Sequence, residues 1–380
     1  MARRCRAILL DPATIAVMEA ALLVTVNDSD DTLAELRELA ITAGARVVDE
    51  FVQRRDHPDP ATYIGKGKVD QLRQTVLAES IDVVIFDDEL SPSQARNLEE
   101  ALETKVVDRT GLILDIFARR AQTKEGKLQV ELAQWNYRLS RLAGGRSYLS
   151  RLGGGIGTRG PGETKLEMDR RQIRHRIAVL GREIEAIRKH RQLHRDRRRR
   201  DRLPLVSLVG YTNAGKSTLF QALSGETTLV SSRMFSTLDP LIRKIRLGGR
   251  RSILISDTVG FIRKLPHQLV SAFRATLEEV VQADLILHVI DSSDDDRDRK
   301  REVVLGVLKE IGAGANPVLT VYSKADLLAE TDVRRAATEG DVLVSARNGD
   351  GLDQLVDRLI RALPDWNPSG SPDAPELNSQ

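Results

Sequence analysis

A glycine-rich octapeptide in the middle of the chain constrains the fold more than any other stretch. Residues 210–217 fit the pattern G-x-x-x-x-G-K-S/T of a phosphate-binding loop. The apolar run Leu205–Val209 before it predicts a buried strand, and residues 218–223 after it predict the first turns of a helix. This strand–loop–helix order is the context that the motif requires, and it predicts an α/β domain with a mixed, mostly parallel sheet and flanking helices. A chance glycine turn is the alternative, which the flanking strand and helix disfavour.

The residue types in this loop suit a nucleoside phosphate. The N–H groups of a glycine-rich turn and the start of the next helix attract phosphate oxygens. Lys216 can reach the outer phosphates, and Ser217 can offer its hydroxyl to Mg²⁺. We assign nucleotide binding to Gly210, Tyr211, Thr212, Asn213, Ala214, Gly215, Lys216, Ser217 and Thr218.

Three later stretches favour guanine over adenine. Asp257 ends a predicted strand, where its carboxylate can hold the hydration shell of Mg²⁺, and the N–H of Gly260 can donate to a γ-phosphate. Asp326 follows another strand and can accept N1–H and the 2-amino group of guanine, which adenine cannot offer. Residues that follow the strands 318–322 and 342–344 complete the predicted base contacts: Ser323, Lys324, Asp326, Ser345 and Ala346.

Thr237 lies between the phosphate-binding loop and Asp257. A threonine on a mobile segment at this position can reach Mg²⁺ and the γ-phosphate only in the triphosphate state. An ordinary loop threonine is the alternative. The predicted Mg²⁺ ligands are Ser217, Thr237 and, through water, Asp257. Catalytic roles are predicted for Lys216, Thr237 and Gly260.

A chain of 380 residues is long for one hydrophobic core, so several domains are expected. In residues 1–118, predicted strands at 22–26, 46–52, 81–86 and 105–107 alternate with predicted helices at 32–43, 69–79 and 91–102. This order predicts a small parallel-sheet α/β domain. Within it, residues 63–68 predict a tight turn before a helix, and a second phosphate site there stays open. A guanine-nucleotide domain is predicted at 203–363 and a disordered tail at 364–380.

Residues 119–202 concentrate positive charge, with 24 Lys and Arg against 9 Asp and Glu. Apolar residues at heptad spacing predict two helices, at 125–142 and 166–187, which fold back as an antiparallel coiled-coil hairpin. The joining loop, 144–162, holds eight glycines and three arginines, a pliable basic composition that suits RNA. The candidate RNA contacts are Arg146, Arg151, Arg159, Gly154, Gly155 and Gly157. Four arginines at 197–200 predict a basic linker to the next domain. A solvated helical face is the alternative for this charge.

Cysteine usage and hydropathy bear on the compartment. The one cysteine, Cys5, cannot form an intrachain disulfide, which favours a reducing environment. No apolar stretch reaches membrane-spanning length. We expect a cytoplasmic monomer, with peripheral association with a membrane left open.

Longer runs of the sequence resemble the HflX family of translational GTPases. The resemblance covers nearly everything before the tail and is carried by DRTGLILDIF at 108–117, GKLQVELAQ at 126–134, GGIGTRGPGET at 154–164, residues 209–220, and DTVGFI at 257–262. It implies a GTP/GDP switch with Mg²⁺, docking on the large ribosomal subunit and its rRNA, and splitting of stalled or idle ribosomes. It also implies that the glycine-rich tip points toward the peptidyl-transferase centre.

One position departs from the family pattern, and a second differs from many other GTPases. Ser323 stands where the base-binding motif has asparagine, so we expect weaker or faster-exchanging nucleotide, with selectivity kept by Asp326. Phe261 stands where many GTPases carry a water-orienting glutamine, so basal hydrolysis is expected to be slow and stimulated by the ribosome. Asn213 matches the asparagine that potassium-activated GTPases use as an ion ligand, which makes K⁺ a second candidate cofactor. A GTP-gated RNA-binding regulator, and an interaction protein with a structural nucleotide, are the alternative functions.

Overall fold

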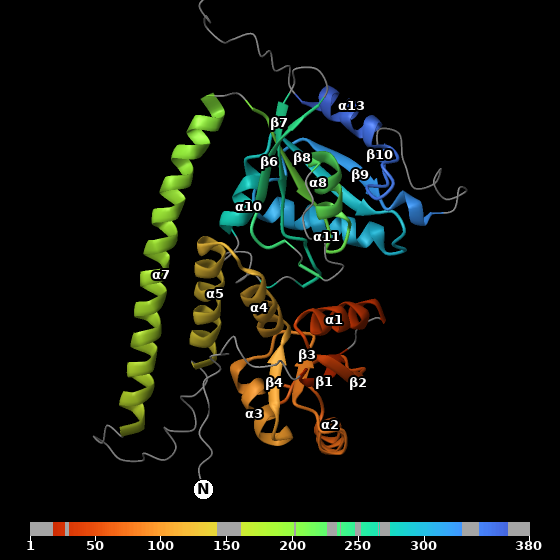
Figure 1. Cartoon of the computed structure of the whole chain (residues 1–380). Coiled ribbons are helices and arrows are strands. Elements are labelled where there is room, and N and C mark those ends of the chain that lie inside the picture. The colour runs from red at the N-terminus through yellow and green to blue at the C-terminus, as the bar shows by residue number, and fades with distance from the viewer. Residues whose placement is uncertain are drawn as a thin grey trace, which may run out of the picture. The chain divides into compact units, whose positions relative to one another are not determined.

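A computed structural model describes residues 18–26, 30–142, 161–200, 203–225, 234–235, 237–247, 252–264, 266, 274–328 and 342–363 (Figure 1). The chain divides into two compact units, Met1–Asp87 with Gln94–Asp108, and Asp88–Ser93 with Arg109–Gln380. Each unit has its own parallel or mostly parallel sheet, and the two are described separately.

The first unit is the small α/β fold that the alternating pattern predicts. Its strands pair in the order β2-β1-β3-β4, and every pairing is parallel. The central strand β1 is buried along its whole length, as expected for a strand covered on both faces. The elements are β1 (Ala20–Val26), α1 (Asp30–Thr42), β2 (Arg46–Gln53), α2 (Lys66–Ala78), β3 (Val83–Phe86), α3 (Pro92–Leu102) and β4 (Lys105–Asp108).

The turn predicted at residues 63–68 is present and leads into α2. Asp59 and Tyr63 form a short bridge, and Gly65 precedes the first residue of the helix. The Asp59 carboxylate accepts the N–H groups of Ala61 and Thr62, and these bonds lower its pKa. A phosphate site at this turn stays a prediction.

In the described part of the second unit, two helices that precede the predicted nucleotide domain pack along each other (Figure 1). The described helices of this region are α4 (Arg109–Arg120), α5 (Lys124–Leu142) and α7 (Pro161–Arg200). Leu128 of α5 and Leu180 of α7 are buried, and Arg176 of α7 forms an ion pair with Glu131 of α5 at 2.8 Å. The two predicted heptad helices are therefore present.

The structure differs from the sequence-based prediction in two places in this region. The arginines at 197–200 were expected in a linker, yet α7 is helical to Arg200, because arginine has high helix propensity and nothing before that residue breaks the helix. Helix α4, which follows β4 directly, was not anticipated. The loop residues proposed to contact RNA lie outside the described residues: Arg146, Arg151, Arg159, Gly154, Gly155 and Gly157.

The domain predicted to bind a nucleotide contains, in its described residues, a six-stranded sheet in the order β10-β9-β8-β5-β7-β6. Only β6 runs antiparallel to its neighbour, which confirms the mixed, mostly parallel sheet. The strands are β5 (Leu205–Val209), β6 (Leu241–Arg246), β7 (Ser252–Asp257), β8 (Leu285–Asp291), β9 (Val318–Ser323) and β10 (Val342–Leu343). The helices are α8 (Lys216–Ser224), α10 (Arg274–Val281), α11 (Arg297–Glu310), the short 3₁₀ helix η2 (Ala325–Leu327) and α13 (Leu352–Ala362).

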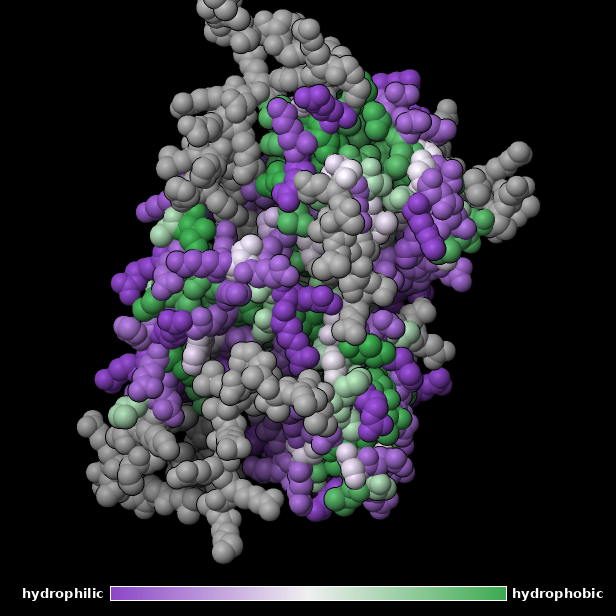
Figure 2. Space-filling model, viewed as in Figure 1, coloured by the Kyte–Doolittle hydropathy of each residue, from purple (hydrophilic) through white to green (hydrophobic). Residues whose placement is uncertain are grey.

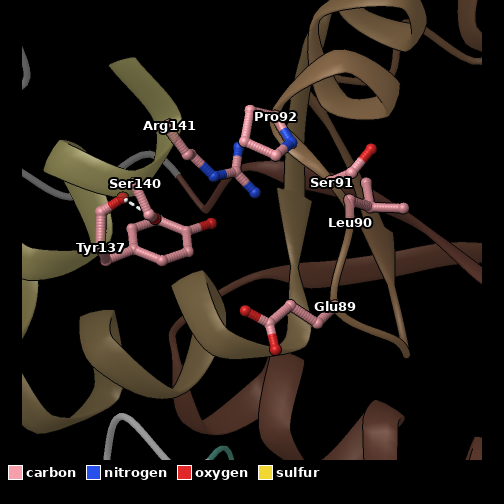
Figure 3. Close-up of a pocket in the computed structure, with 7 residues that line it drawn as sticks. All are labelled: Glu89, Leu90, Ser91, Pro92, Tyr137, Ser140 and Arg141. Atoms are coloured by element: carbon pink, nitrogen blue, oxygen red, sulfur yellow. Dashed lines mark hydrogen bonds between the residues drawn. The ribbon is translucent and has the colours of Figure 1, made fainter. Parts of the chain in front are cut away.

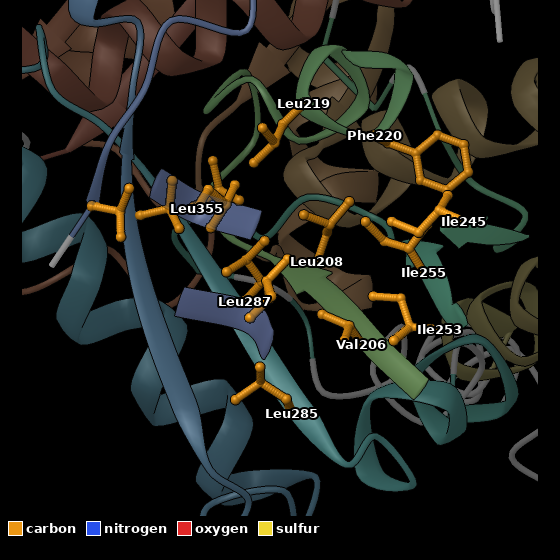
Figure 4. Packing of buried hydrophobic residues seen from close by; sticks show 14 of the residues in the cluster. Val206, Leu208, Leu219, Phe220, Ile245, Ile253, Ile255, Leu285, Leu287 and Leu355 are labelled. Atoms are coloured by element: carbon orange, nitrogen blue, oxygen red, sulfur yellow. The ribbon is translucent and has the colours of Figure 1, made fainter. Parts of the chain in front are cut away.

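The core of this domain fixes the edge at which the site forms. Val206 and Leu208 of β5 and Leu287 of β8 pack against Leu219 and Phe220 of α8 (Figure 4). Because β5, β7, β8 and β9 are parallel, their carboxyl ends meet at one edge of the sheet, where ligands of open α/β folds bind.

Few large apolar side chains of the described residues are exposed. On the face seen in Figure 2, hydrophilic and hydrophobic residues are interspersed. Met18, Leu77 and Met168 are the sort of isolated exposed residues that ordinary proteins carry. Within the described ranges, no helix has both the length and the apolar character needed to cross a bilayer.

Candidate nucleotide-binding site

The predicted phosphate-binding loop joins β5 to α8, and its backbone explains its glycines. Gly215 has φ +86°, a left-handed conformation that glycine adopts without strain. Gly210 lies so close to β8 that a Cβ there would collide with the carbonyl of Val289. Asn213 is also left-handed, at φ +60°, which asparagine tolerates better than most residues.

Lys216 is the buried cation of this loop. Its Nζ donates to the carbonyls of Gly210, at 3.2 Å, and Tyr211, at 2.8 Å. Burial lowers its pKa to about 8, and the nearby Asp257 carboxylate opposes the shift. An anion that enters the loop would favour the charged ammonium again, so the lysine is suited to meet phosphate oxygens.

The three predicted Mg²⁺ ligands come together although they are distant in sequence. Asp257 Oδ2 accepts the Ser217 and Thr237 hydroxyls at 2.7 Å each, and the two hydroxyl oxygens are 3.0 Å apart. Asp257 is fully buried, and burial raises its pKa. Its Oδ1 is also buried and has no partner at hydrogen-bond geometry within the described ranges. Two hydroxyls and a carboxylate with an unused oxygen fit a hard, oxygen-seeking cation such as Mg²⁺.

The segment after Asp257 is joined to the phosphate loop through the backbone. Thr212 N–H donates to the Phe261 carbonyl at 2.7 Å, and Phe261 N–H donates to the Gly210 carbonyl at 3.1 Å. A Cβ on Gly260 would lie 2.8 Å from the Thr212 Cα and 2.9 Å from the Lys216 Nζ, so only glycine fits. The phenyl ring of Phe261 is buried and offers no polar atom to a water molecule.

The residues predicted to bind the base meet at the ends of β9 and β10. The Ser345 hydroxyl donates to Asp326 Oδ1 at 2.7 Å, and Ala325 N–H donates to the Val344 carbonyl at 3.1 Å. Lys324 has φ +57° and forms an ion pair with Asp291 at 2.6 Å. Within the described ranges, the hydrogen bond from Ser345 engages one oxygen of the Asp326 carboxylate.

Ser323 connects this base end to the phosphate end. Its hydroxyl is within hydrogen-bond distance of two carbonyls, those of Ala214 at 2.6 Å and Ile290 at 3.0 Å. Ser345 is buried and Ala346 packs against the sheet core, so both follow β10 at the edge predicted from the sequence. Thr218 follows Ser217 on α8.

Two residues near the site were missed by the sequence reasoning. Asp291 ends β8 at the same sheet edge as Asp257, and it holds Lys324. Ser292 donates its hydroxyl to the Ser323 carbonyl at 2.5 Å. The rule that polar residues at carboxyl ends of parallel strands gather at one edge would have identified Asp291.

A separate cavity of about 330 Å³ shares no lining residue with this site. Figure 3 shows Tyr137, Ser140 and Arg141 of α5 facing the segment from Glu89 to Pro92. The Arg141 guanidinium lies 4.5 Å from the Tyr137 ring centroid, a cation–π contact that fills part of this space.

Three family models match successive parts of the chain. Residues 30–118 match the model described as GTP-binding GTPase N-terminal, and residues 120–198 match GTP-binding GTPase Middle Region. Residues 205–324 match the model described as 50S ribosome-binding GTPase.

Curated relatives and a solved structure extend these matches over almost the whole chain. The GTPase HflX of Caldanaerobacter subterraneus is 53% identical, over 91% of this chain and 81% of the relative. The GTPase HflX of Escherichia coli is 45% identical, over 91% of this chain and 83% of the relative. A crystal structure of SsGBP in complex with GDP is 27% identical, with a TM-score of 0.51, and covers 91% of this chain and 98% of its own.

Proposed function

This chain belongs to the HflX family of GTPases, and from that membership we propose that it uses its GTP/GDP switch to split stalled or idle ribosomes. GTP hydrolysis to GDP and phosphate follows from the family and from the nucleotide domain. The proposal concerns what hydrolysis drives. Its target is the large ribosomal subunit and its rRNA, and its site of action is the cytoplasm.

The contact of Ser217, Thr237 and Asp257 carries the proposal of a switch. These three side chains come from α8, the segment before β6, and the end of β7, and they converge on one carboxylate oxygen. Bound Mg²⁺ would neutralise charge on the β- and γ-phosphates. Ser217 and Thr237 would offer hydroxyl oxygens to it, and Asp257 would hold its water shell. Only Thr237 lies on the segment that the γ-phosphate can hold or release.

The remaining site residues would bind and orient the nucleotide. Lys216 would neutralise the outer phosphates, and the N–H of Gly260 would hold the γ-phosphate from the other side. The Asp326 carboxylate, oriented by Ser345, would select guanine, and Ser323 would keep the base end in register with the phosphate end. No side chain at Phe261 can orient water, so we expect slow hydrolysis without a partner.

Charge on the helical region supports an rRNA partner. Residues 119–202 contain 24 basic and 9 acidic residues. Part of this positive charge lies on the paired helices α5 and α7. Phosphate contacts from such a surface supply affinity without reading sequence. The family model described as 50S ribosome-binding GTPase makes the large subunit the expected target.

Co-sedimentation tests this proposal. The protein would be incubated with ribosomes and a non-hydrolysable GTP analogue, and then centrifuged through a sucrose gradient. We expect it to migrate with the large subunit, and to do so less with GDP. A variant lacking residues 153–162 is the matched control, since it should bind GTP but not migrate with the subunit. Protein that remains at the top of the gradient with both nucleotides would contradict the proposal.

A further inference from the structure

Asp239 connects the segment that carries Thr237 to the start of α5. Its Oδ2 accepts the backbone N–H groups of Gln122 and Thr123, each at 2.9 Å. Its Oδ1 accepts the Thr123 hydroxyl at 2.5 Å. A carboxylate that accepts several donors at the beginning of a helix is held firmly, because charge-assisted hydrogen bonds are strong and directional.

The first turn of α5 is built around this carboxylate. The Thr123 hydroxyl accepts the N–H of Gly126 at 3.0 Å, so one side chain caps the helix and donates to Asp239. Gly126 has low helix propensity, yet a Cβ there would collide with Asp239 Oδ1. The close approach of Asp239 therefore accounts for a glycine inside a helix.

The same segment is also anchored on the other side of Thr237. The ring of Phe235 packs edge-on against Phe117 of α4, with centroids 4.8 Å apart, and Phe235 is buried. Its backbone has φ +54°, a conformation that a bulky residue adopts only when its surroundings impose it. Thr237 is thus held between two attachments to the α4–α5 region while its hydroxyl contacts Asp257.

The segment that follows Gly260 meets the same region. The guanidinium of Arg109, at the start of α4, donates to the Arg263 carbonyl at 2.9 Å. Arg109 is almost fully buried, so this contact is part of the packed interior. The segment that carries Thr237 and the segment that follows Gly260 are therefore each attached to α4 or α5.

We propose that Asp239 is a positioning residue that couples the nucleotide state at Thr237 to the start of the basic helical pair. The inference rests on the proposed function, because it takes Thr237 to respond to the γ-phosphate. With GTP bound, Thr237 is held at the site and Asp239 is held at α5. With GDP bound, Thr237 is released and the Asp239 contact weakens. By linkage, a partner that holds α5 favours the GTP state by the same factor.

A double-mutant cycle on Asp239 and Thr123 tests the coupling in the full-length protein. The readout is the ratio of the affinities for a non-hydrolysable GTP analogue and for GDP. Coupling free energies between sites typically correspond to about 5- to 150-fold, so we expect Asp239→Ala to reduce the ratio by about 5- to 10-fold. Thr123→Ala should reduce it as well, and the double variant should be no worse than Asp239→Ala. Thr123→Ser keeps the hydroxyl and should behave like the wild type, as should Asp353→Ala on the exposed side of α13.

Hydrogen exchange gives a second measurement. If Asp239 had a purely structural role, exchange would not depend on which nucleotide is bound. The amides of Gln122 and Thr123 should exchange more slowly with the GTP analogue than with GDP, and Asp239→Ala should remove that difference. Additive effects in the cycle, or an unchanged ratio in both single variants, would overturn the role of Asp239. Because Thr123 is exposed, its variants should fold even if Asp239→Ala does not. A wild-type protein that binds no guanine nucleotide would instead defeat the proposed function.

Discussion

The hydroxyl oxygen of Ser323 lies 2.6 Å from the carbonyl oxygen of Ala214. This contact joins the end of β9 to the phosphate-binding loop with a side chain shorter than the asparagine usual at that position. Gly215 is needed for its φ of +86° and not for space, because a Cβ there would lie 3.5 Å from Ser323 Oγ, an ordinary van der Waals distance. A single hydroxyl proton can satisfy only one of its two carbonyl neighbours at a time, so the connection is present but weaker than an amide could make it.

Removing this hydroxyl should weaken nucleotide binding. Ser323→Ala leaves the buried carbonyl of Ala214 without its donor, which we expect to lower GDP affinity about 5- to 10-fold, on the scale of one hydrogen bond. Ser323→Asn supplies a second donor and should slow GDP release. Release of a fluorescent GDP analogue measures both effects. Ser224→Ala, at the end of α8, is the control, and equal release rates for Ser323→Ala and the wild type would contradict this role.

Changing Asp326 to asparagine should change the preferred base. The amide oxygen can still accept the Ser345 hydroxyl, so the loop should keep its structure. The amide NH₂ cannot accept the two guanine donors, and loss of two hydrogen bonds to a charged group should reduce GTP affinity by about 100-fold or more. It can donate to the extra carbonyl of xanthine, so XTP should compete better than GTP. Competition binding measures the preference, and a variant that still prefers GTP would show that Asp326 does not read the base.

The pKa of Lys216 predicts a pH dependence of GTP binding. Burial lowers this pKa to about 8 in the free protein, whereas the bound phosphates require the charged ammonium. Binding must therefore take up a proton above pH 8, and linkage predicts that affinity falls toward about tenfold per pH unit there. Below pH 8 the lysine is already charged, so Lys216 should add no pH dependence. Calorimetric titration from pH 7 to pH 9 measures this, and an affinity that stays constant through pH 9 would exclude it.

Asn213 should make hydrolysis depend on the monovalent cation. If its side chain helps to hold K⁺ near the phosphates, GTP turnover should be faster in KCl than in NaCl. Because Asn213 has φ +60°, Asn213→Gly removes the ligand without straining the loop, and it should abolish the difference while leaving GDP affinity nearly unchanged. Steady-state phosphate release with and without ribosomes measures the effect. Equal rates in the two salts under both conditions would rule out a role for K⁺.

Local sequence was sufficient to predict residues that the fold brings together at the candidate nucleotide site. A glycine pattern between a strand and a helix identified residues 210–217, and polar residues after apolar runs identified Asp257 and Asp326. This works because parallel strands bring their carboxyl ends to one edge whatever lies between them in the chain. The convergence of Ser217, Thr237 and Asp257 follows the same logic, with Thr237 inferred from its position alone.

Contacts between residues that are distant in the sequence could not be predicted from local patterns. Asp239 looks like an ordinary loop acid, and its attachment to Thr123 depends on how α5 packs beside the nucleotide domain. The buried Arg109 gives no local signal either, because its acceptor is a backbone carbonyl far along the chain. The helical course of α7 through residues 197–200 was not predicted, because a run of charge does not distinguish a linker from a helix and arginine is a good helix former.

Light scattering by intact ribosomes after the protein is added tests ribosome splitting most directly. With a non-hydrolysable GTP analogue, scattering should fall as large and small subunits separate, and with GDP it should remain constant. The variant without residues 153–162 should leave scattering constant with either nucleotide. Constant scattering with the GTP analogue, under conditions in which the protein co-sediments with the large subunit, would contradict ribosome splitting and favour a GTP-gated RNA-binding regulator.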